Sequence, residues 1–246
     1  MIKVKQEGDV MLVKAAVTDF AESLGYCQFK IPLSIKGLKP EQTQALAEGF
    51  RAHHEEEVYE QEHVELEPVT PEQIQDSKED IEFARENIFS RFMDVVQFPS
   101  QPVVVSLSGR VDKIMRLGQT LIVQDDKFVS NPQSYEKKSQ PYVNHMLQVM
   151  TYLNSSYGTK NSPDPENWFS MPHSEKMWKI RICDRKSREP YKIFSNKFDS
   201  FSAKFFQESL RIFAGVATGM MEPEHHNSKR KCDACGLKNF CDHRIL

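Results

Sequence analysis

The sequence predicts a single α/β (α+β) domain in which helices flank a short sheet. Two patterns predict it: apolar residues recur at three- and four-residue steps in some segments, and β-branched runs fill others. Hydrophobic residues are 39% and charged residues 27% of the chain, as in globular proteins. A chain of 246 residues buries a substantial core, so we expect one domain over residues 1–246.

The N-terminal part, residues 1–98, is expected to be mainly helical. A first helix is predicted from Pro40 to about Gln61, because Pro opens it and good helix formers follow. Residues 55–80 are strongly acidic and contain two prolines, which is typical of a solvated helix face followed by a turn. A second, amphipathic helix ending near Pro99 is predicted from the apolar residues Ile81, Ala84, Ile88, Phe92 and Val95.

Residues 99–222 are predicted to form the core, and they begin with a β-hairpin. Its strands are VVVSLSGRVDKIM from Val103 and TLIVQDDKFV from Thr120. A helix is predicted from Pro141 to Leu153. A second strand pair, MWKIRICDR (177–185) and EPYKIF (189–194), is followed by the helix SFSAKFFQESLRIFAGVATG (200–219), which a capping Ser opens.

Targeting signals are not recognisable in the sequence. The start, MIKVKQEGDVMLVK, lacks the apolar segment of a secretory signal, and the longest uncharged apolar-rich run, Ile212 to Met221, is shorter than the ~18 residues of a membrane span. We therefore expect a cytoplasmic protein that does not act at a membrane. The net charge of −3 means that contact with nucleic acid would depend on a local basic patch.

The hairpin brings potential catalytic groups together. With a two-residue turn at Gly118-Gln119, Leu117 pairs with Thr120 and Asp112 falls opposite Asp125. Lys127 points to the same face as both carboxylates, because side chains alternate along a strand. A divalent cation would relieve the repulsion between the acids, and a Lys beside it suits phosphodiester hydrolysis. A register shifted by one residue, with the acids diverging into solvent, is the alternative.

Other polar side chains could join this site. Gln148 and Tyr152 lie four residues apart and hence on one face of the predicted helix. His53 follows Gly49 by four residues on the first predicted helix, and its imidazole is either structural or an additional metal ligand.

The C-terminal tail, residues 223–246, is rich in cysteine. Five cysteines without a secretion signal favour metal ligation or burial over disulfides. Cys183 lies in an apolar strand and is expected in the core. A soft-metal site is expected to use Cys232, Cys235 and Cys241, with either His243 or the distant Cys27 as the fourth ligand. With His243, the tail would be a zinc-dependent nucleic-acid-binding module in which residues 229–231 contact phosphates.

Taken in order, these motifs resemble a known enzyme family. The motifs are Cys27, Gly49-Phe-Arg-Ala-His53, Gly109-Arg-Val-Asp112, Asp125-Asp-Lys127, Gln148-Val-Met-Thr-Tyr152 and Cys232-x2-Cys235-x5-Cys241. Together they resemble the RecB-like branch of the PD-(D/E)XK nucleases and, within it, the CRISPR-associated iron–sulfur exonucleases, the fourth numbered Cas protein family. The resemblance implies a restriction-endonuclease-like core sheet flanked by helices. Asp125 stands where Glu is frequent in that family.

The resemblance also implies ligands and roles. Mn²⁺ or Mg²⁺ would be bound by His53, Asp112, Asp125 and the backbone carbonyl of Asp126. Lys127 would position the attacking water, and Gln148 and Tyr152 would contact DNA near the scissile phosphate. An iron–sulfur cluster, expected as [4Fe–4S], would be held by Cys27, Cys232, Cys235 and Cys241 and would join the tail to the N-terminal helix.

The implied activity is cleavage of single-stranded DNA, or of DNA with single-stranded ends, in the 5′ to 3′ direction. The implied role is trimming DNA fragments for CRISPR spacer acquisition, with the spacer-integration complex as a partner. A RecB-like repair nuclease outside CRISPR would carry the same residues. Oligomerisation is left open.

Overall fold

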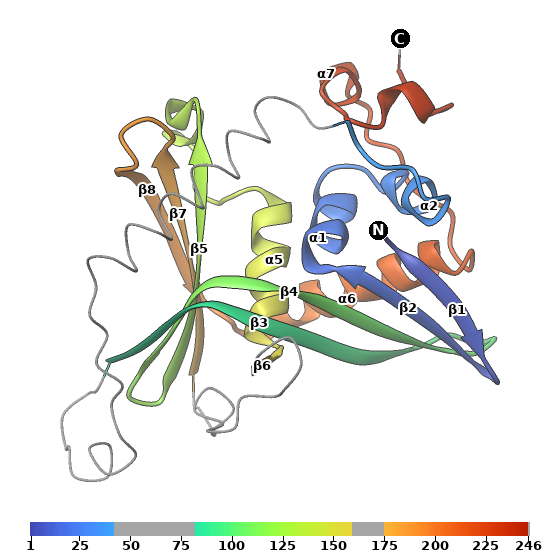
Figure 1. Cartoon of the computed structure of the whole chain (residues 1–246), viewed down its shortest axis with the longest axis horizontal. Helices are drawn as coiled ribbons and strands as arrows, with labels where there is room; N and C mark the ends of the chain where they lie inside the picture. Colours follow the sequence, from blue (N-terminus) through green and yellow to red (C-terminus); the bar gives the residue numbers. More distant parts are fainter. Residues whose placement is uncertain (42–81, 159–174, 246) are drawn as a thin grey trace.

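A computed structural model describes residues 1–41, 82–158 and 175–245 of the chain. In this part of the chain, one mixed sheet runs through the molecule and helices pack against it (Figure 1). The predicted fold class, an α/β arrangement with a core sheet flanked by helices, is therefore confirmed.

The sheet has eight strands among the described residues. The order is β1-β2-β4-β5-β7-β8, and β3 pairs with both β4 and β6. The strands are β1 (Lys3–Glu7), β2 (Val10–Ala16), β3 (Glu82–Gln97), β4 (Pro102–Leu117), β5 (Thr120–Val129), β6 (Ser156–Gly158), β7 (Glu175–Asp184) and β8 (Pro190–Lys197). The pairs β2–β4 and β5–β7 are parallel, and the other pairs are antiparallel.

Helices cover the sheet, and further helices follow β2 and lie in the C-terminal tail. They are α1 (Val17–Gly25), α2 (Lys30–Ile35), α5 (Val143–Leu153), α6 (Ser200–Ala217) and α7 (Lys229–Asp233), with short 3₁₀ turns at Pro132–Tyr135 and Lys238–Phe240. Among the described residues, no helix has both the length and the apolar character needed to cross a bilayer.

The β4–β5 hairpin has the predicted register. Leu117 pairs with Thr120, and the ladder continues to Lys113 opposite Gln124. Gly118 has φ of 55°, a conformation that glycine adopts without strain, whereas Gln119 is not in the positive-φ region. A positive φ at the first turn position alone matches the expected type II′ turn.

The helix predicted over residues 81–98 is wrong, because this segment forms β3 and pairs with β4 along nearly its whole length. Ile88, Phe92 and Val96 are four residues apart, and a spacing of four places side chains on one face in a strand as well as in a helix. Val95 distinguishes the strand from the predicted helix. It would be buried on the apolar face of the helix, but it is 49% exposed.

The N-terminal part is thus not mainly helical in the described ranges, since β1 and β2 also precede α1. The β3–β4 pair crosses the boundary expected at residues 98 and 99, so the described fold does not separate the two parts there. The helix predicted from Pro40 to Gln61 lies outside the described residues after Glu41, as do the acidic stretch and His53.

The later elements agree with the sequence analysis. α5 begins at Val143, two residues after Pro141, and β7 and β8 form the expected antiparallel pair. α6 is also present, but its N-cap is Asp199 rather than a Ser: the carboxylate accepts a hydrogen bond from the backbone N–H of Ser202 at 2.8 Å. A carboxylate at this end also interacts favourably with the helix dipole.

An aromatic cluster joins the helices to the sheet. The ring of Phe20 on α1 meets those of Phe206 and Phe213 on α6 edge-on, with centroids 6.2 and 5.2 Å apart. Phe206 in turn meets Phe92 on β3 at 5.3 Å. Such edge-to-face pairs add to the stabilisation that burial of the rings already provides.

The C-terminal tail packs against the N-terminal helices (Figure 1). The hydroxyl of Tyr26 donates to the backbone carbonyl of Lys231 at 2.6 Å, and the backbone N–H of Glu41 donates to the carbonyl of Gly236 at 3.0 Å. Leu237 is buried at the same contact. The two ends of the chain therefore meet at the loop that carries Cys27.

Candidate active site

The two acidic side chains expected to converge lie on neighbouring strands. The last pair of the β4–β5 ladder joins Lys113 to Gln124. Asp112 and Asp125 lie one residue beyond this pair on their strands. Oδ2 of Asp112 accepts a hydrogen bond from the backbone N–H of Asp126 at 2.9 Å. The alternative register, in which the acids would diverge into solvent, is thereby excluded.

Helix α5 places polar groups over the two acids. Nζ of Lys127 lies 2.6 Å from Oδ2 of Asp125 and donates to Oε1 of Gln148 at 3.0 Å. Nε2 of Gln148 donates to Oδ1 of Asp125 at 3.0 Å and lies 3.4 Å from the hydroxyl of Tyr152. Gln148 thus fixes the positions of both the amine and the carboxylate.

Asp126 points to the opposite face of the sheet from Asp125. Its carboxylate binds the guanidinium of Arg181 on β7 through two hydrogen bonds, and it also accepts one from Nε2 of Gln124 at 3.2 Å. A two-point Arg–carboxylate pair holds a fixed geometry. This pair anchors the backbone of β5 directly beside Asp125, including the carbonyl expected to bind metal.

Burial dominates the electrostatics of the site. Asp125 is fully buried, and burial, together with the charge of Asp112, raises its pKa to about 7 even though Lys127 opposes the shift. Burial likewise raises the pKa of Asp112. Burial alone would lower the pKa of Lys127, but the carboxylates of Asp125 and Asp112 raise it overall, so the amine stays charged.

Tyr152 lies beneath the acids and is almost fully buried. Burial raises its pKa, and the nearby charges of Asp125 and Asp112 add to the effect, so the phenol remains protonated. Its ring packs against Gly109 of β4: a Cβ there would lie 2.9 Å from the hydroxyl and 3.0 Å from Cε1. Glycine is therefore required at 109 to admit the ring. The Tyr152 hydroxyl lies 3.4 Å from Nε2 of Gln148, close enough to help hold that side chain in place.

His145 of α5 is a buried, neutral imidazole near the same site. Burial, together with the positive charge of Lys127, lowers its pKa to about 3. Its ring stacks on Tyr135, with centroids 6.4 Å apart and an interplanar angle of 14°. This environment is that of a packed histidine.

The donors at this position suit a hard divalent cation. Two carboxylates that resist ionisation when close together would gain from a cation between them, and oxygen ligands are those that Mg²⁺ and Mn²⁺ prefer. Asp112 and Asp125 supply such ligands on one face of the hairpin.

Comparison with known proteins gives a family assignment. The sequence matches the profile of the PD-(D/E)XK nuclease superfamily over residues 12–242. The chain belongs to this superfamily. Its members cleave nucleic acid with divalent metals such as Mg²⁺ or Mn²⁺, so the chain is a nuclease with a nucleic-acid substrate. The comparison with curated proteins finds no match.

Solved structures similar to this one include two with low sequence identity. One, described as SSO0001, has 14% sequence identity and a TM-score of 0.45, and the match covers 98% of this chain and 90% of that one. Another, an alkaline exonuclease from Laribacter hongkongensis, has 11% identity and a TM-score of 0.43, with 84% and 89% covered.

The cysteines are divided between two places. Cys183 is buried on β7 against Phe128, as expected of a core residue. Cys27 lies in the loop between α1 and α2; burial raises its pKa, and the nearby thiols of Cys235, Cys241 and Cys232 raise it further. The cysteine far upstream is therefore near enough to the three of the tail for their charges to affect its pKa.

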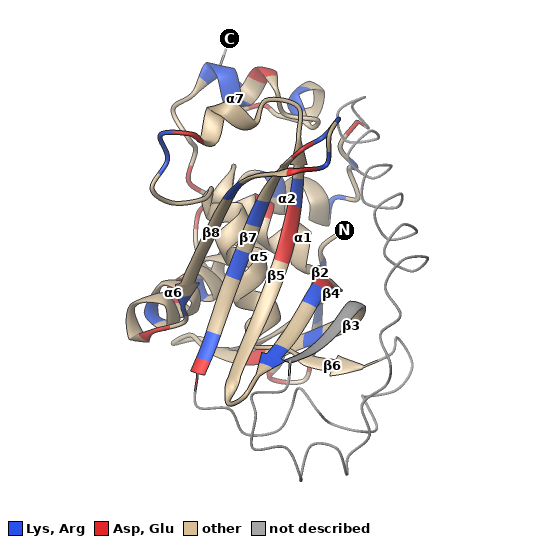
Figure 2. Cartoon of the chain, turned by 90° about the vertical axis from the view of Figure 1, so that its left-hand side faces the viewer, with Lys and Arg blue, Asp and Glu red and all other residues tan. Residues whose placement is uncertain are grey.

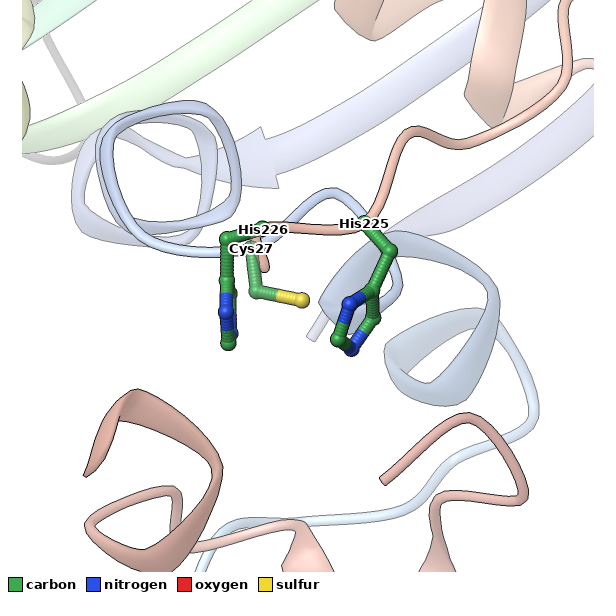
Figure 3. A group of neighbouring side chains, drawn as sticks. All are labelled: Cys27, His225 and His226. Atoms are coloured by element: carbon green, nitrogen blue, oxygen red, sulfur yellow. The ribbon is translucent and has the colours of Figure 1, made fainter. Parts of the chain in front are cut away.

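Two residues beside Cys27 were not identified from the sequence. The ligand atoms of Cys27, His225 and His226 all lie within 4.8 Å of one another (Figure 3). His243, the alternative fourth ligand, instead packs its ring on Phe29 with centroids 4.0 Å apart. The sequence does contain a pattern that could have identified them. His225 and His226 are adjacent and lie seven and six residues before Cys232, so they could have been added to the potential metal ligands of the tail.

Proposed function

We propose that this chain is a divalent-metal-dependent deoxyribonuclease that acts as an exonuclease on single-stranded DNA or single-stranded ends. The observation that carries the proposal is the convergence of Asp112, Asp125 and Lys127 beneath Gln148, in a chain of the PD-(D/E)XK superfamily.

Each side chain has a role in this proposal. Asp112, Asp125 and the backbone carbonyl of Asp126, with His53, would hold Mn²⁺ or Mg²⁺, which polarises the phosphate and lowers the pKa of water. Lys127 keeps a positive charge at the site, orients the attacking water by hydrogen bonding and stabilises the charge that develops on the phosphate. Gln148 holds Lys127 and Asp125 at fixed separation.

Basic residues near the site supply contacts for a DNA backbone. Lys and Arg recur along β7 and β4, the strands on either side of β5 (Figure 2). Lys176 of β7 is one of them; it shares the face of Asp125, because Asp125 pairs with Ile180 and side chains alternate along a strand. Because the net charge of the chain is −3, attraction of a phosphate backbone must come from such local groups.

Cleavage of end-labelled single strands tests the activity. Asp112→Ala, Asp125→Ala and Lys127→Ala are each expected to abolish cleavage in Mn²⁺ or Mg²⁺, and EDTA should abolish it in the wild type. Lys197→Ala is a matched control, since Lys197 is exposed and forms an ion pair with Glu175. Undiminished cleavage by all three active-site variants would refute the proposal. The order in which labelled products appear tests the 5′ to 3′ direction.

We further propose that Cys27, Cys232, Cys235 and Cys241 bind an iron–sulfur cluster, expected as [4Fe–4S]. The electrostatic influence of the three tail thiols on Cys27 supports this, since four thiolates are the usual ligands of such clusters. Protein purified without oxygen should be brown and contain iron and sulfide. A Cys27→Ser variant that retained the full cluster would show that another group is the fourth ligand.

The biological role is proposed to be trimming of DNA fragments before CRISPR spacer integration. The order and spacing of the motifs support it, whereas repair outside CRISPR is the alternative. A mixture of this protein with a spacer integrase and fragments carrying long single-stranded ends tests the role. Integration of trimmed fragments that depends on Asp125 is expected, and integration unaffected by the protein would argue for the repair role.

A further inference from the structure

A group of soft-metal donors lies at the junction of the N-terminal helices and the tail. Cys27 comes from the loop after α1, and His225 and His226 come from the segment between α6 and α7. In Figure 3 the sulfur of Cys27 lies between the two imidazole rings, and both rings extend into the same space. Three donors from segments about 200 residues apart in the sequence thus meet at one point.

Neighbouring side chains and backbone hold the two segments together. Oε1 of Gln28, the residue after Cys27, accepts a hydrogen bond from the backbone N–H of Glu224 at 2.8 Å. The carbonyl of His226 accepts one from the N–H of Ser228, also at 2.8 Å. The first bond holds the backbone just before the two histidines against the cysteine loop, and the second closes a local turn after them.

Aromatic rings orient the imidazoles. His225 lies against Phe29, with ring centroids 5.7 Å apart, and His226 meets Tyr26 edge-on at 6.0 Å. The two imidazoles are themselves 4.6 Å apart. Rings packed in this way lose little further freedom when they bind an ion, which is the advantage of a preorganised site.

One nitrogen of the group lacks a partner. Nδ1 of His226 is buried and has no hydrogen bond to any described residue. A buried polar atom left unpaired costs about 1–3 kcal/mol, so a structure that keeps one calls for an explanation such as a bound ion.

The distances are close to those of ligands on a common ion. Zinc binds sulfur at about 2.3 Å and imidazole nitrogen at about 2.0–2.1 Å, so tetrahedral ligands lie about 3.3–3.8 Å from one another. The three atoms of the group lie within 4.8 Å, and Sγ of Cys232 lies 3.8 Å from Nε2 of His225. Side-chain shifts of about 1 Å would bring the atoms of Cys27, His225 and His226 into the shell of one ion.

We propose that Cys27, His225 and His226 form a site for a single Zn²⁺, with Cys232 as the fourth ligand. A mixture of thiolate and imidazole in four-coordinate geometry is typical of structural zinc. The site rests on this geometry and not on the proposed exonuclease activity. It uses neither Cys235 nor Cys241, so it differs from a site built of the four cysteines.

Zinc and the proposed iron–sulfur cluster would exclude each other, because both need the thiolates of Cys27 and Cys232. Iron-free protein would then keep the tail docked through zinc. Whether the junction contains zinc or the iron–sulfur cluster would depend on which of them is supplied to the protein.

The experiment uses the full-length chain, stripped of metal by reduction and chelation under nitrogen and titrated with Zn²⁺ against a chromophoric chelator. The Cys235→Ser/Cys241→Ser variant cannot form a four-cysteine site. It is expected to bind one Zn²⁺ per chain, and its Co²⁺ form to show the visible bands of a tetrahedral site with thiolate ligands. Adding His225→Ala and His226→Ala should weaken binding by more than the 10–100-fold that outer-shell substitutions cause.

His243→Ala in the same background is the matched control and should leave Zn²⁺ affinity unchanged, because His243 packs on Phe29 outside the group. Circular dichroism verifies that the variants are folded, and His225→Gln with His226→Gln provides a milder second pair. Affinity within threefold of the parent after loss of both imidazoles would overturn the proposal, as would no binding by the parent. Iron–sulfur reconstitution of wild type and of His225→Ala/His226→Ala tests the four-cysteine cluster separately.

Discussion

The substitution Asp125→Asn is expected to stabilise the metal-free protein while abolishing its activity. Asp125 is fully buried, and burial together with the charge of Asp112 raises its pKa from 3.8 to about 7. The folded state therefore disfavours the ionised carboxylate. Asn has nearly the same shape but no charge, so it removes the unfavourable ionisation.

The size and sign of the expected change in stability follow from the pKa of Asp125. Because one pKa unit corresponds to about 1.4 kcal/mol, the rise from 3.8 to about 7 limits the destabilisation to about 4 kcal/mol. The folded-state pKa is the higher one, so this destabilisation is absent below pH 3.8, grows up to pH 7 and is complete above it. Lys127 loses its ionic partner in the variant, so we expect a net gain of about 1–3 kcal/mol at pH 8 and less at pH 5.

Urea denaturation in EDTA at pH 5 and pH 8 measures this effect. The matched control is Asp126→Asn, the same change one residue further on. Asp126 is paired with Arg181, so its substitution should lower the free energy of unfolding by about 1–3 kcal/mol. Added Mn²⁺ should stabilise the wild type and not Asp125→Asn. Equal destabilisation by both substitutions at pH 8 would refute the electrostatic reasoning.

Three further substitutions test the supporting structure. Gln148→Ala should lower kcat by about 10–100-fold with little change in KM, measured by single-strand cleavage, because Gln148 positions Lys127 and Asp125. Gly109→Ala should lower kcat in the same assay and leave the circular dichroism spectrum unchanged, since the new Cβ displaces the Tyr152 ring. Phe20→Ala should lower the free energy of unfolding by about 3–5 kcal/mol in urea, because its ring fills the junction of α1 and α6.

The hairpin could be predicted because its information is local. Gly118 fixes the turn, the turn fixes the register, and the register places Asp112 beside Asp125. The segment that forms β3 could not be assigned in the same way. Its buried residues are spaced by four, which suits a helix as well as a strand, and only pairing with β4 decides between them.

Some residues of the candidate site could likewise be predicted from local sequence, whereas others depend on tertiary packing. The acids and Lys127 follow from one hairpin, and Gln148 and Tyr152 follow from one helical face. The partnership of Asp126 with Arg181 depends on the parallel pairing of β5 with β7, strands separated in sequence by a helix. The meeting of His225 and His226 with Cys27 depends on how the tail packs, and no local pattern contains that information.

Asp125 and Asp126 show how the fold tolerates a site that opposes its own stability. The two carboxylates are adjacent in sequence and point to opposite faces of β5, so one backbone segment carries both. On one face, Asp125 is held without enough countercharge to keep its pKa low. On the other, Asp126 and Arg181 form a two-point ion pair that fixes the same backbone. A catalytic metal would need the ionised carboxylate of Asp125, which is unfavourable in the folded state. The Asp126–Arg181 ion pair at the next residue stabilises the same strand and offsets this cost.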